Sequence, residues 1–353
     1  MSMSFKILTL NDSEEWNNLL AKLPAEQQDI YYTPEYYSLY QNYGDGKAMC
    51  FVFEKDGGIA LYPFLINSVN ALGYDLDKEY FDIQGAYGYN GVVSSSYDPS
   101  FIKEYFSEFN CFCADNNIIA DFSRFHPLIK NHLFSINYSN IVFDRNTIYV
   151  ELNNSYEEIS ANYQRTTRKQ IRRAKEKYNI TTQRLGKEFS KEFYKLYKEA
   201  MQNVNAIDYL FFNEAYFNDL LALNNCDCFV AIMDGKIISA ITTLKHNKYL
   251  HGHLGGTLQD FNKLSPFSLL YDEIIKYGKE QECDYIHFGG GATPKEDDPV
   301  LLFKKHFSDK IGEFHIGKKV HNSDVYNETV RIWERKYPEK TEKYKNYLLK
   351  YRY

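Results

Sequence analysis

A ten-residue segment near the start of the chain recurs almost half a chain length later. Residues 50–59 read CFVFEKDGGI and residues 228–237 read CFVAIMDGKI, so six of ten positions match at an offset of 178. Each copy has a β-rich run, an Asp-Gly pair and a second apolar run. This pattern is typical of a β-hairpin, because the turn needs the positive φ that glycine adopts cheaply. A repeat at half the length of a 353-residue chain favours a duplicated domain.

The expected helices and strands alternate in both halves. The first half has predicted strands at 5–9, 118–124 and 139–151, a hairpin at 48–66, and helices from about 12, at 34–43 and at 99–116. The second half has predicted helices at 155–178, 190–203, 213–223, 266–281 and 299–307, a hairpin at 228–245, and strands at 248–254, 284–288 and 311–317. The sequence therefore predicts an α+β fold with two tandem domains, 1–152 and 153–320, each a mixed, mainly antiparallel sheet flanked by helices. A helical tail is expected at 321–353.

Charge and composition exclude several classes of protein. Charged residues are 25% and hydrophobic residues 44%, as in ordinary globular proteins, and the net charge of 41 − 47 = −6 argues against a DNA-binding protein. The chain has no run of 18 uncharged apolar residues and no basic-then-apolar leader, so neither a membrane-spanning helix nor a secretory signal is expected. Six cysteines without CxxC spacing predict reduced, buried thiols rather than a metal site. We therefore expect a cytoplasmic protein with no bound metal or cofactor.

A strongly basic helix opens the predicted second domain. Ser155 and Glu158 have the S-x-x-E spacing of a capping box, which marks the helix start. Residues 165–177 hold seven basic side chains and one acid. Three of the basic residues line one helix face: Arg168, Arg172 and Lys175. Arginine forks bind phosphates at two points, so this face is a candidate phosphate site, with a solvated helix face as the alternative.

Two further features of the second half predict anion binding and proton transfer. A strand at 248–254, a loop and a helix that begins after Ser265 form a β-α-β crossover, where backbone N–H groups can meet phosphates. The run Gly289-Gly290-Gly291 ends the next strand, and its N–H groups form either an anion nest or only a flexible turn. His253, on the strand before the loop, is a candidate base or a hydrogen-bonded structural histidine.

A glycine-spaced loop in the first half, residues 84–91, offers hydroxyl and amide groups. Tyr87, Tyr89 and Asn90 alternate there with glycines. These side chains are candidates for gripping a sugar or a peptide, and core aromatics at a turn are the alternative.

Five segments, in the same order along the chain, resemble those of one family. The first two are YGYNG at 87–91 and RFHP at 124–127. The others are RKQIRRAK at 168–175, SPFSLL at 265–270, and FGGG at 288–291 followed by Asp298 and FKKHFS at 303–308. They resemble segments of the GNAT acyltransferases. The resemblance is strongest to the FemABX branch, which comprises the peptidoglycan-bridge aminoacyl transferases and their sugar-acylating relatives. That branch carries two GNAT-like domains in one chain.

The resemblance implies roles for several residues. The lysine of the family's F-K-x-x-F motif stabilises the oxyanion formed during acyl transfer, and Lys304 matches it. Without the resemblance, Lys304 would be a surface lysine on an amphipathic helix. Asp298 either orients Lys304 or the acceptor amine, or only begins the helix at 299. Arg124 and the 87–91 loop are implied to line the acceptor cleft.

The acyl donor is constrained by one departure from the GNAT pattern. GNAT proteins that use acetyl-CoA carry Q/R-x-x-G-x-G/A between the strand and the helix, but residues 262–267 read NKLSPF, without glycine. This argues against CoA and agrees with the FemABX branch, whose better-known members use aminoacyl-tRNA. The implied donor co-substrate is therefore either aminoacyl-tRNA or acyl-CoA.

The function implied by the resemblance is transfer of an acyl or aminoacyl group to an amine or hydroxyl of a cell-envelope precursor. The precursor would be nucleotide- or lipid-linked, carrying a peptidoglycan peptide or an amino sugar. A tRNA acceptor stem is a further candidate partner, and peripheral membrane contact is compatible with this role. Two alternatives stay open. One is an acetyl-CoA-dependent sugar N-acyltransferase. The other is a non-catalytic glycan- or nucleotide-binding module with a degenerate GNAT fold, in which Lys304 would point into the core.

Overall fold

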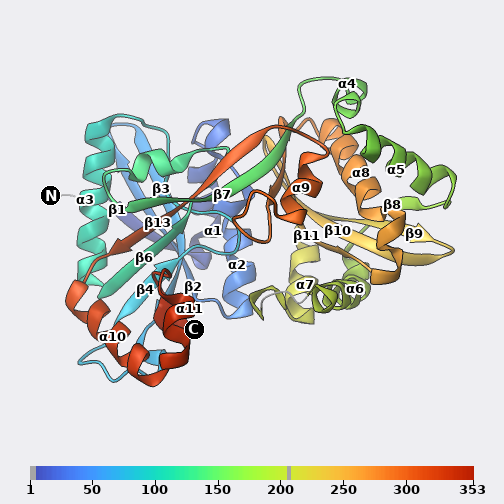
Figure 1. Ribbon diagram of the computed structural model, residues 1–353. Coiled ribbons are helices and arrows are strands. Elements are labelled where there is room, and N and C mark those ends of the chain that lie inside the picture. Colours follow the sequence, from blue (N-terminus) through green and yellow to red (C-terminus); the bar gives the residue numbers. More distant parts are fainter. Residues whose placement is uncertain (1–4, 205–207) are drawn as a thin grey trace. The chain divides into compact units, whose positions relative to one another are not determined.

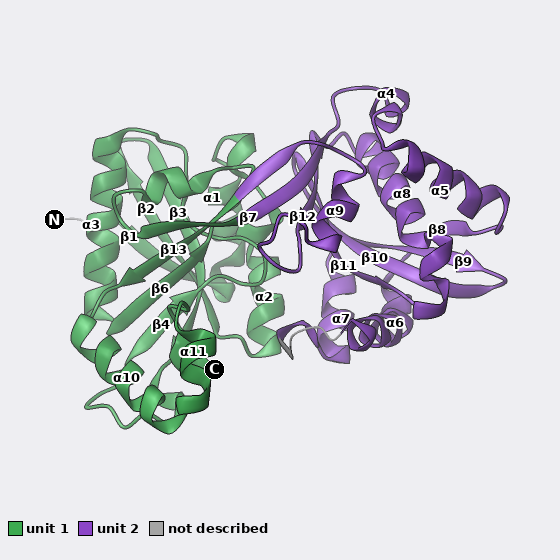
Figure 2. Cartoon of the chain, viewed as in Figure 1, with its two compact units in different colours: residues 1–144, 314–353 green, residues 145–313 purple. Residues whose placement is uncertain are grey.

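The computed structural model of the protein describes residues 5–204 and 208–353 and divides the chain into two compact units. Unit 1 comprises residues 1–144 and 314–353, and unit 2 comprises residues 145–313 (Figure 2). The helices among the described residues are too short or too polar to cross a lipid bilayer.

Unit 1 contains strands and helices from both ends of the chain. Its strands are β1 (Phe5–Thr9), β2 (Lys47–Lys55), β3 (Gly58–Ser68), β4 (Phe81–Gln84), β5 (Val93–Ser94) and β6 (Ile118–Arg124). Its helices are α1 (Ser13–Leu20), α2 (Pro34–Tyr43), α3 (Pro99–Asp115), α10 (Ser323–Lys336) and α11 (Thr341–Tyr344). Two long strands, β7 (Asn140–Glu151) and β13 (Ile311–Val320), contribute residues to both units.

The sheet of unit 1 has the order β1-β2-β3-β4-β6, followed by the end of β13, with β5 added beside β3. The pair β4–β6 is parallel, and the neighbouring pairs are antiparallel. Aromatic residues of α3 pack with Ile118 on one face, whereas Trp333 of α10 packs with Ile119 on the other. Successive residues of a strand point to opposite faces, so β6 separates these two cores.

Unit 2 repeats this arrangement. Its further strands are β8 (Thr181–Leu185), β9 (Cys226–Met233), β10 (Lys236–His246), β11 (Tyr249–Thr257) and β12 (Tyr285–Gly290). Its helices are α4 (Tyr156–Ala161), α5 (Arg165–Glu176), α6 (Ser190–Asn203), α7 (Glu214–Ala222), α8 (Pro266–Glu280) and α9 (Pro299–Lys305). The order is β7-β12-β11-β10-β9-β8, with one parallel pair, β11–β12. Helix α8 covers one face of this sheet, and α6 and α7 cover the other (Figure 1).

The predicted duplication is visible in the order of elements. In each unit a hairpin is followed by a strand, a helix and a second strand parallel to the first: β2-β3-β4-α3-β6, with the short β5 before α3, and β9-β10-β11-α8-β12. Both hairpin turns have positive φ at the Asp-Gly pair, 50° and 82° at Asp56-Gly57 and 51° and 76° at Asp234-Gly235. The predicted α+β class with mixed, mainly antiparallel sheets is therefore confirmed.

The compact units differ from the predicted domains in their boundaries. Residues 321–353 were expected to form a separate tail, but they complete the core of unit 1 through Trp333 and Tyr351. The predicted helix 155–178 is two helices, because Tyr163 is buried against Phe307, with ring centroids 5.2 Å apart, and this fixes the break between α4 and α5. The capping box of Ser155 and Glu158 is present at the start of α4.

Candidate active site

The two parallel strands of unit 2 separate toward their carboxyl ends. They pair only between Tyr249–His251 and Tyr285–His287, although β11 continues to Thr257 and β12 continues to Gly290 along β7. Ligands of sheets with parallel strands bind at the carboxyl ends of those strands. We therefore expect a ligand of unit 2 to bind at this end of the β11–β12 pair, where the backbones part.

A bulge in β11, opposite β10, lies next to this separation. The register between β10 and β11 shifts between Ile241 and Thr243. The Thr242 hydroxyl fills the gap, since it accepts a hydrogen bond from the Leu254 N–H and donates one to the Leu254 carbonyl, both at 3.1 Å. Bulges bend the strand that carries them, so this contact fixes the course of β11 beyond the last residue paired with β12.

Helix α8 begins at the same end of the sheet. Ser265 precedes it in the left-handed region, at φ 58°, and the helix opens with Pro266. Ser265 makes no side-chain cap, so the start of α8 depends on backbone geometry. A 15-residue helix presents its positive dipole end here, which is the anion-binding geometry expected from the crossover.

The glycine run at the end of β12 makes room for charged side chains. A Cβ on Gly290 would lie 2.8 Å from Cδ of Arg145, and one on Gly291 would lie 2.5 Å from Oδ1 of Asp298. Gly289 has φ 75°, and a Cβ there would lie 3.6 Å from Nζ of Lys304. The run was expected to offer its N–H groups to an anion. The contacts in the structure instead engage its carbonyls, which hold two cations.

Lys304 lies on α9 with its ammonium against this run. Its Nζ donates a hydrogen bond to the Gly290 carbonyl at 2.6 Å. On the same helix, Phe303 packs on Tyr271 of α8, with ring centroids 5.3 Å apart, and this fixes the helix against the start of α8. Burial lowers the pKa of Lys304 to about 8, Asp298 opposes this, and Arg145 adds to it. Lys304 is thus a fixed, desolvated cation at the carboxyl end of β12.

Asp298 is the N-cap of α9. Its carboxylate accepts hydrogen bonds from the N–H groups of Val300 at 2.9 Å and Leu301 at 3.1 Å, and also from the backbone and hydroxyl of Thr293, each at 2.9 Å. Burial raises its pKa, but these hydrogen bonds, led by Leu301 and Thr293, bring it down to about 2. Asp298 therefore begins the helix, which is one of the two roles that the sequence suggested. It also anchors the loop beside Lys304.

The basic residues on α5 have different partners. Arg168 donates a hydrogen bond to the carbonyl of Ala161, and Arg172 lies 3.9 Å from Glu176. Both side chains are exposed. Lys175 is engaged by two acids of α8: its Nζ lies 3.6 Å from Asp272 Oδ2 and 3.1 Å from Glu273 Oε1. Lys175 therefore joins α5 to α8. Of the three basic residues predicted to bind phosphate, only Arg168 and Arg172 are not engaged by acids of α8.

His253 is a poor candidate for the base. Its Nε2 lies 3.3 Å from the hydroxyl of Tyr216 on α7. Burial, assisted by the charge of His251, lowers the pKa of His253 to about 3. A group with such a pKa takes up few protons near neutral pH. The structure therefore favours a structural histidine over the base that the sequence suggested.

The predicted acceptor residues of unit 1 hold the 85–91 loop together. Asn90 N–H donates to the Arg124 carbonyl, and the Arg124 N–H donates to Asn90 Oδ1, both at 2.6 Å. The Arg124 guanidinium donates to the carbonyls of Gly85 at 2.6 Å and Ala86 at 2.7 Å. Asn131, which the sequence did not single out, donates to the Asn90 carbonyl at 2.9 Å. Asn90 is fully buried, so it frames the loop instead of offering the predicted surface contact.

The two tyrosines of this loop differ in exposure. Tyr89 is 9% exposed, and its ring packs at 5.2 Å from that of Tyr31. Tyr87 is half-buried, and its carbonyl accepts a hydrogen bond from the Tyr36 hydroxyl at 2.5 Å. Gly88 has φ 101°, and a Cβ there would run into the ring of Tyr31. Tyr89 is therefore a core aromatic, and Tyr87 keeps the exposure that a ligand contact needs.

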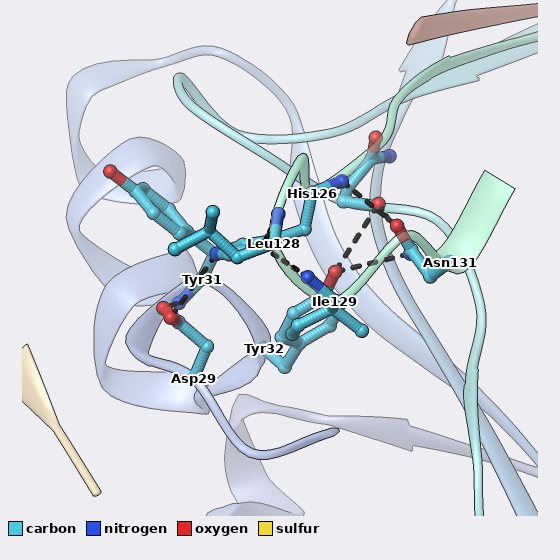
Figure 3. A network of polar contacts seen from close by, with 8 residues as sticks. Asp29, Tyr31, Tyr32, His126, Leu128, Ile129 and Asn131 are labelled. Carbon is cyan, nitrogen blue, oxygen red and sulfur yellow. Dashed lines mark hydrogen bonds and ion pairs between the residues drawn. The ribbon is translucent and has the colours of Figure 1, made fainter. Parts of the chain in front are cut away.

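A buried histidine lies beside this loop (Figure 3). Nδ1 of His126 accepts hydrogen bonds from the N–H groups of Leu128 at 3.2 Å and Ile129 at 3.1 Å, and Nε2 lies 3.3 Å from Asp29 Oδ2. Because Nδ1 is an acceptor, the proton of the neutral ring is on Nε2, facing Asp29. Both ring nitrogens are thus engaged, which fits a structural role for His126.

Sequence reasoning missed three residues that organise these sites. Arg145, Thr242 and Asn131 lie in strands or a short loop without any recognisable motif around them. They matter because they hydrogen-bond backbone carbonyls that are distant in the sequence, and the residues next to them in the chain do not reveal such contacts. For two of them a glycine was the available hint, because a Cβ on Gly290 would meet Arg145 and one on Gly91 would meet Asn131.

Part of the chain matches a known family of domains. Residues 161–297 match the family of acetyltransferase (GNAT) domains. No curated protein matches the chain in sequence. The crystal structure of FemX matches with a TM-score of 0.70 at 13% identity, over 92% of this chain and 99% of FemX.

Two further solved structures share the fold. One is the C-terminal domain of a putative lysylphosphatidylglycerol synthetase from Agrobacterium fabrum, with a TM-score of 0.53 at 12% identity, over 89% of this chain and 92% of that domain. The other is a tandem GNAT protein from the clavulanic acid biosynthesis pathway, with a TM-score of 0.52 at 10% identity, over 90% of this chain and 98% of its own. Residues 161–297 thus form a GNAT acyltransferase domain, and over most of its length the chain has the fold of FemX and of a tandem GNAT protein.

Proposed function

We propose that the protein transfers an acyl or aminoacyl group to an amine or hydroxyl of a cell-envelope precursor, in the cytoplasm. The observation that carries this proposal is the Lys304 ammonium, held at 2.6 Å on the Gly290 carbonyl where β12 has left β11. The FemX-like fold supports the acceptor class, and the fold shared with a putative lysylphosphatidylglycerol synthetase supports aminoacyl transfer.

The reaction is a direct attack in a ternary complex. The acceptor nitrogen or oxygen forms a bond to the acyl carbon, and the carbonyl π electrons move onto oxygen to give a tetrahedral oxyanion. The intermediate collapses, the bond to the donor breaks, and the proton of the acceptor passes to the departing group or to solvent. One ammonium N–H of Lys304 is taken by Gly290, so two remain for the oxyanion. A fixed donor of this kind is worth about 3–4 kcal/mol of transition-state stabilisation.

The charge state of Lys304 limits this chemistry. Its pKa of about 8 keeps most molecules protonated at neutral pH, although burial disfavours the charge. Lys304 also bears on the binding-module alternative, which requires this side chain to point into the apolar core. Its Nζ is bound instead to a backbone carbonyl at a strand end, which supports the acyltransferase over the binding module.

The test of Lys304 is a substitution with a matched control. Lys304→Ala should reduce turnover at least about a hundredfold with folding intact, since it removes an oxyanion donor. Lys310→Ala changes an exposed lysine of the same unit, which pairs with Glu151 at 3.1 Å, and should leave turnover unchanged. Retained activity in Lys304→Ala would reject the proposed mechanism.

The donor is a separate question. The absence of glycine from residues 262–267 favours aminoacyl-tRNA, and the exposed Arg168 and Arg172 are available for its phosphates. The match to acetyltransferase domains favours a second candidate, an acetyl-CoA-dependent sugar N-acyltransferase. Calorimetry with acetyl-CoA and with an aminoacylated acceptor-stem minihelix distinguishes the two. A thermal-shift screen with nucleotide-sugars then identifies the acceptor class.

A further inference from the structure

Arg145 reaches over the glycine run from β7. Its Nη1 donates a hydrogen bond to the Gly291 carbonyl at 2.9 Å. A Cβ on Gly290 would lie 2.8 Å from Arg145 Cδ and 3.2 Å from its Cγ. The stem of the arginine therefore lies directly on Gly290, and a side chain at residue 290 would displace it.

Lys304 meets the same run from α9, one peptide unit away. It binds the Gly290 carbonyl, whereas Arg145 binds the carbonyl of Gly291. Peptide units are planar and share the Cα atom between them, so turning one of these carbonyls disturbs its neighbour. Two cations from different elements thus hold two consecutive carbonyls in place.

We propose that Arg145 is a positioning residue for Lys304: it fixes the glycine carbonyls that orient the Lys304 ammonium, and it sets a positive charge beside that ammonium. The inference rests on the proposed role of Lys304 in acyl transfer. Arg145 has no counterpart in the F-K-x-x-F motif, because it lies more than 150 residues earlier in the chain.

Two charges act on Lys304, one from β7 and one from the start of α9. Arg145 on β7 disfavours the protonated amine, and Asp298 at the start of α9 favours it. Asp298 is held by backbone N–H groups, which fixes its distance from Lys304. The other charged or titratable residues next to Lys304 in sequence are Lys305, which lies 3.6 Å from Glu296, and His306, the C-cap of α9.

This arrangement gives Arg145 two separable effects. Its guanidinium hydrogen-bonds a carbonyl and so affects the position of Lys304. Its positive charge disfavours protonation of Lys304 and so affects its pKa. Removing the arginine should misplace the lysine and also make it more basic. A residue with a merely structural role would produce neither a change in the basicity of Lys304 nor a shifted pH profile.

The experiment uses two substitutions at residue 145. Arg145→Met removes both charge and fork while retaining an unbranched stem, and Arg145→Lys retains the charge without the fork. Arg184→Met is the matched control, because Arg184 is an exposed arginine of the same unit that lies 3.7 Å from Asp227 on the neighbouring strand.

Two readouts are needed. One is the pH dependence of kcat/KM for acyl transfer. The other is the pH dependence of Lys304 acetylation by acetic anhydride, followed by peptide mass spectrometry. This reagent reacts with the neutral amine, so its midpoint reports the basicity of Lys304 without any substrate.

The expected results differ between the variants. In Arg145→Met, the labelling midpoint should rise by about half a pH unit or more, and kcat should fall about tenfold at neutral pH. In Arg145→Lys, the midpoint should stay at the wild-type value while kcat falls less. Arg184→Met should match the wild type in both readouts.

The outcomes separate this inference from the proposed function. If Lys304→Ala is inactive but Arg145→Met keeps the wild-type kcat and labelling midpoint, the positioning role is wrong and the proposed function stands. If Lys304→Ala remains active, the proposed function fails first. If Arg145→Met does not fold, Arg145→Lys decides: lowered kcat with an unshifted midpoint supports the inference, and wild-type kcat overturns it.

Discussion

Arg352 and Asp82 form a two-point ion pair inside unit 1. Nη2 of Arg352 lies 2.6 Å from Oδ1 of Asp82, and Nε lies 2.8 Å from Oδ2. Asp82 has no exposed surface, and its second partner is the hydroxyl of Tyr351 at 3.0 Å. The pair joins β4, which precedes the 85–91 loop, to the segment that follows α11.

Arg352→Met should therefore destabilise unit 1 strongly. Removing one partner of a buried pair leaves an uncompensated charge and costs about 3–5 kcal/mol. Both tryptophans of the chain, Trp16 and Trp333, are buried in unit 1, so their fluorescence during urea unfolding reports on that unit. Arg335→Met, at an exposed position of α10, is the control. A loss below about 1 kcal/mol would show that the pair behaves like a surface ion pair.

The pH profile of transfer should have an alkaline limb set by Lys304. The protonated lysine is the active form, and its pKa of about 8 means that kcat/KM should halve near that pH and fall tenfold for each further unit. The measurement is kcat/KM between pH 6 and 10, corrected for titration of the acceptor amine. A flat profile to pH 10 would contradict the role of the ammonium.

Asp298→Ala should lower stability more than it changes the chemical step. Losing an N-cap costs about 1–2 kcal/mol, and the segment between Gly291 and α9 loses its backbone anchors. Asp298→Asn keeps an acceptor oxygen and should lose less. Asp297→Ala, at the adjacent exposed position, is the control. If Asp298→Asn were inactive at wild-type stability, a direct catalytic role would be indicated instead.

Asp121 should make unit 1 less stable as the pH rises. Burial raises its pKa from 3.8 to about 7, although hydrogen bonds led by that of Tyr62 at 2.6 Å oppose the shift. The native state keeps a proton that the unfolded state releases in this interval, so the free energy of unfolding falls between about pH 4 and 7 and is level above it.

Asp121→Asn stays neutral and isolates this effect. As the pH rises from 4 to 7, the free energy of unfolding of Asp121→Asn should increase relative to that of the wild type. Urea unfolding followed by tryptophan fluorescence at several pH values measures it. A constant difference would mean that Asp121 titrates alike in both states.

Much of the fold could be predicted from the sequence because its signals are local. The Asp-Gly pairs fix the hairpin turns, the capping box fixes the start of α4, and proline marks the start of α3 and α8. The short strands β4, β5 and β8 were missed. β8 is largely exposed and polar, and β4 carries the buried Asp82, so neither shows the expected alternation.

The site was less accessible to prediction because its parts meet through space. The resemblance pointed to Lys304, and the strand end pointed to the glycine run, but the hydrogen bond between them depends on how α9 packs on α8. The low pKa of His253 comes from burial and from His251, and the alternation of residues along the strand does not predict that burial. Asn90 and Arg124 looked like surface groups until their hydrogen bonds to the loop backbone were seen.

The division of the chain has a consequence for its synthesis. Unit 2 is one continuous stretch, whereas unit 1 needs β13 beside β6 and Trp333 in its core. On the ribosome, the residues of unit 2 are therefore all available before unit 1 can close its sheet. Until β13 has been synthesised, β6 lacks this neighbour, and the earlier residues of unit 1 expose an unpaired strand edge.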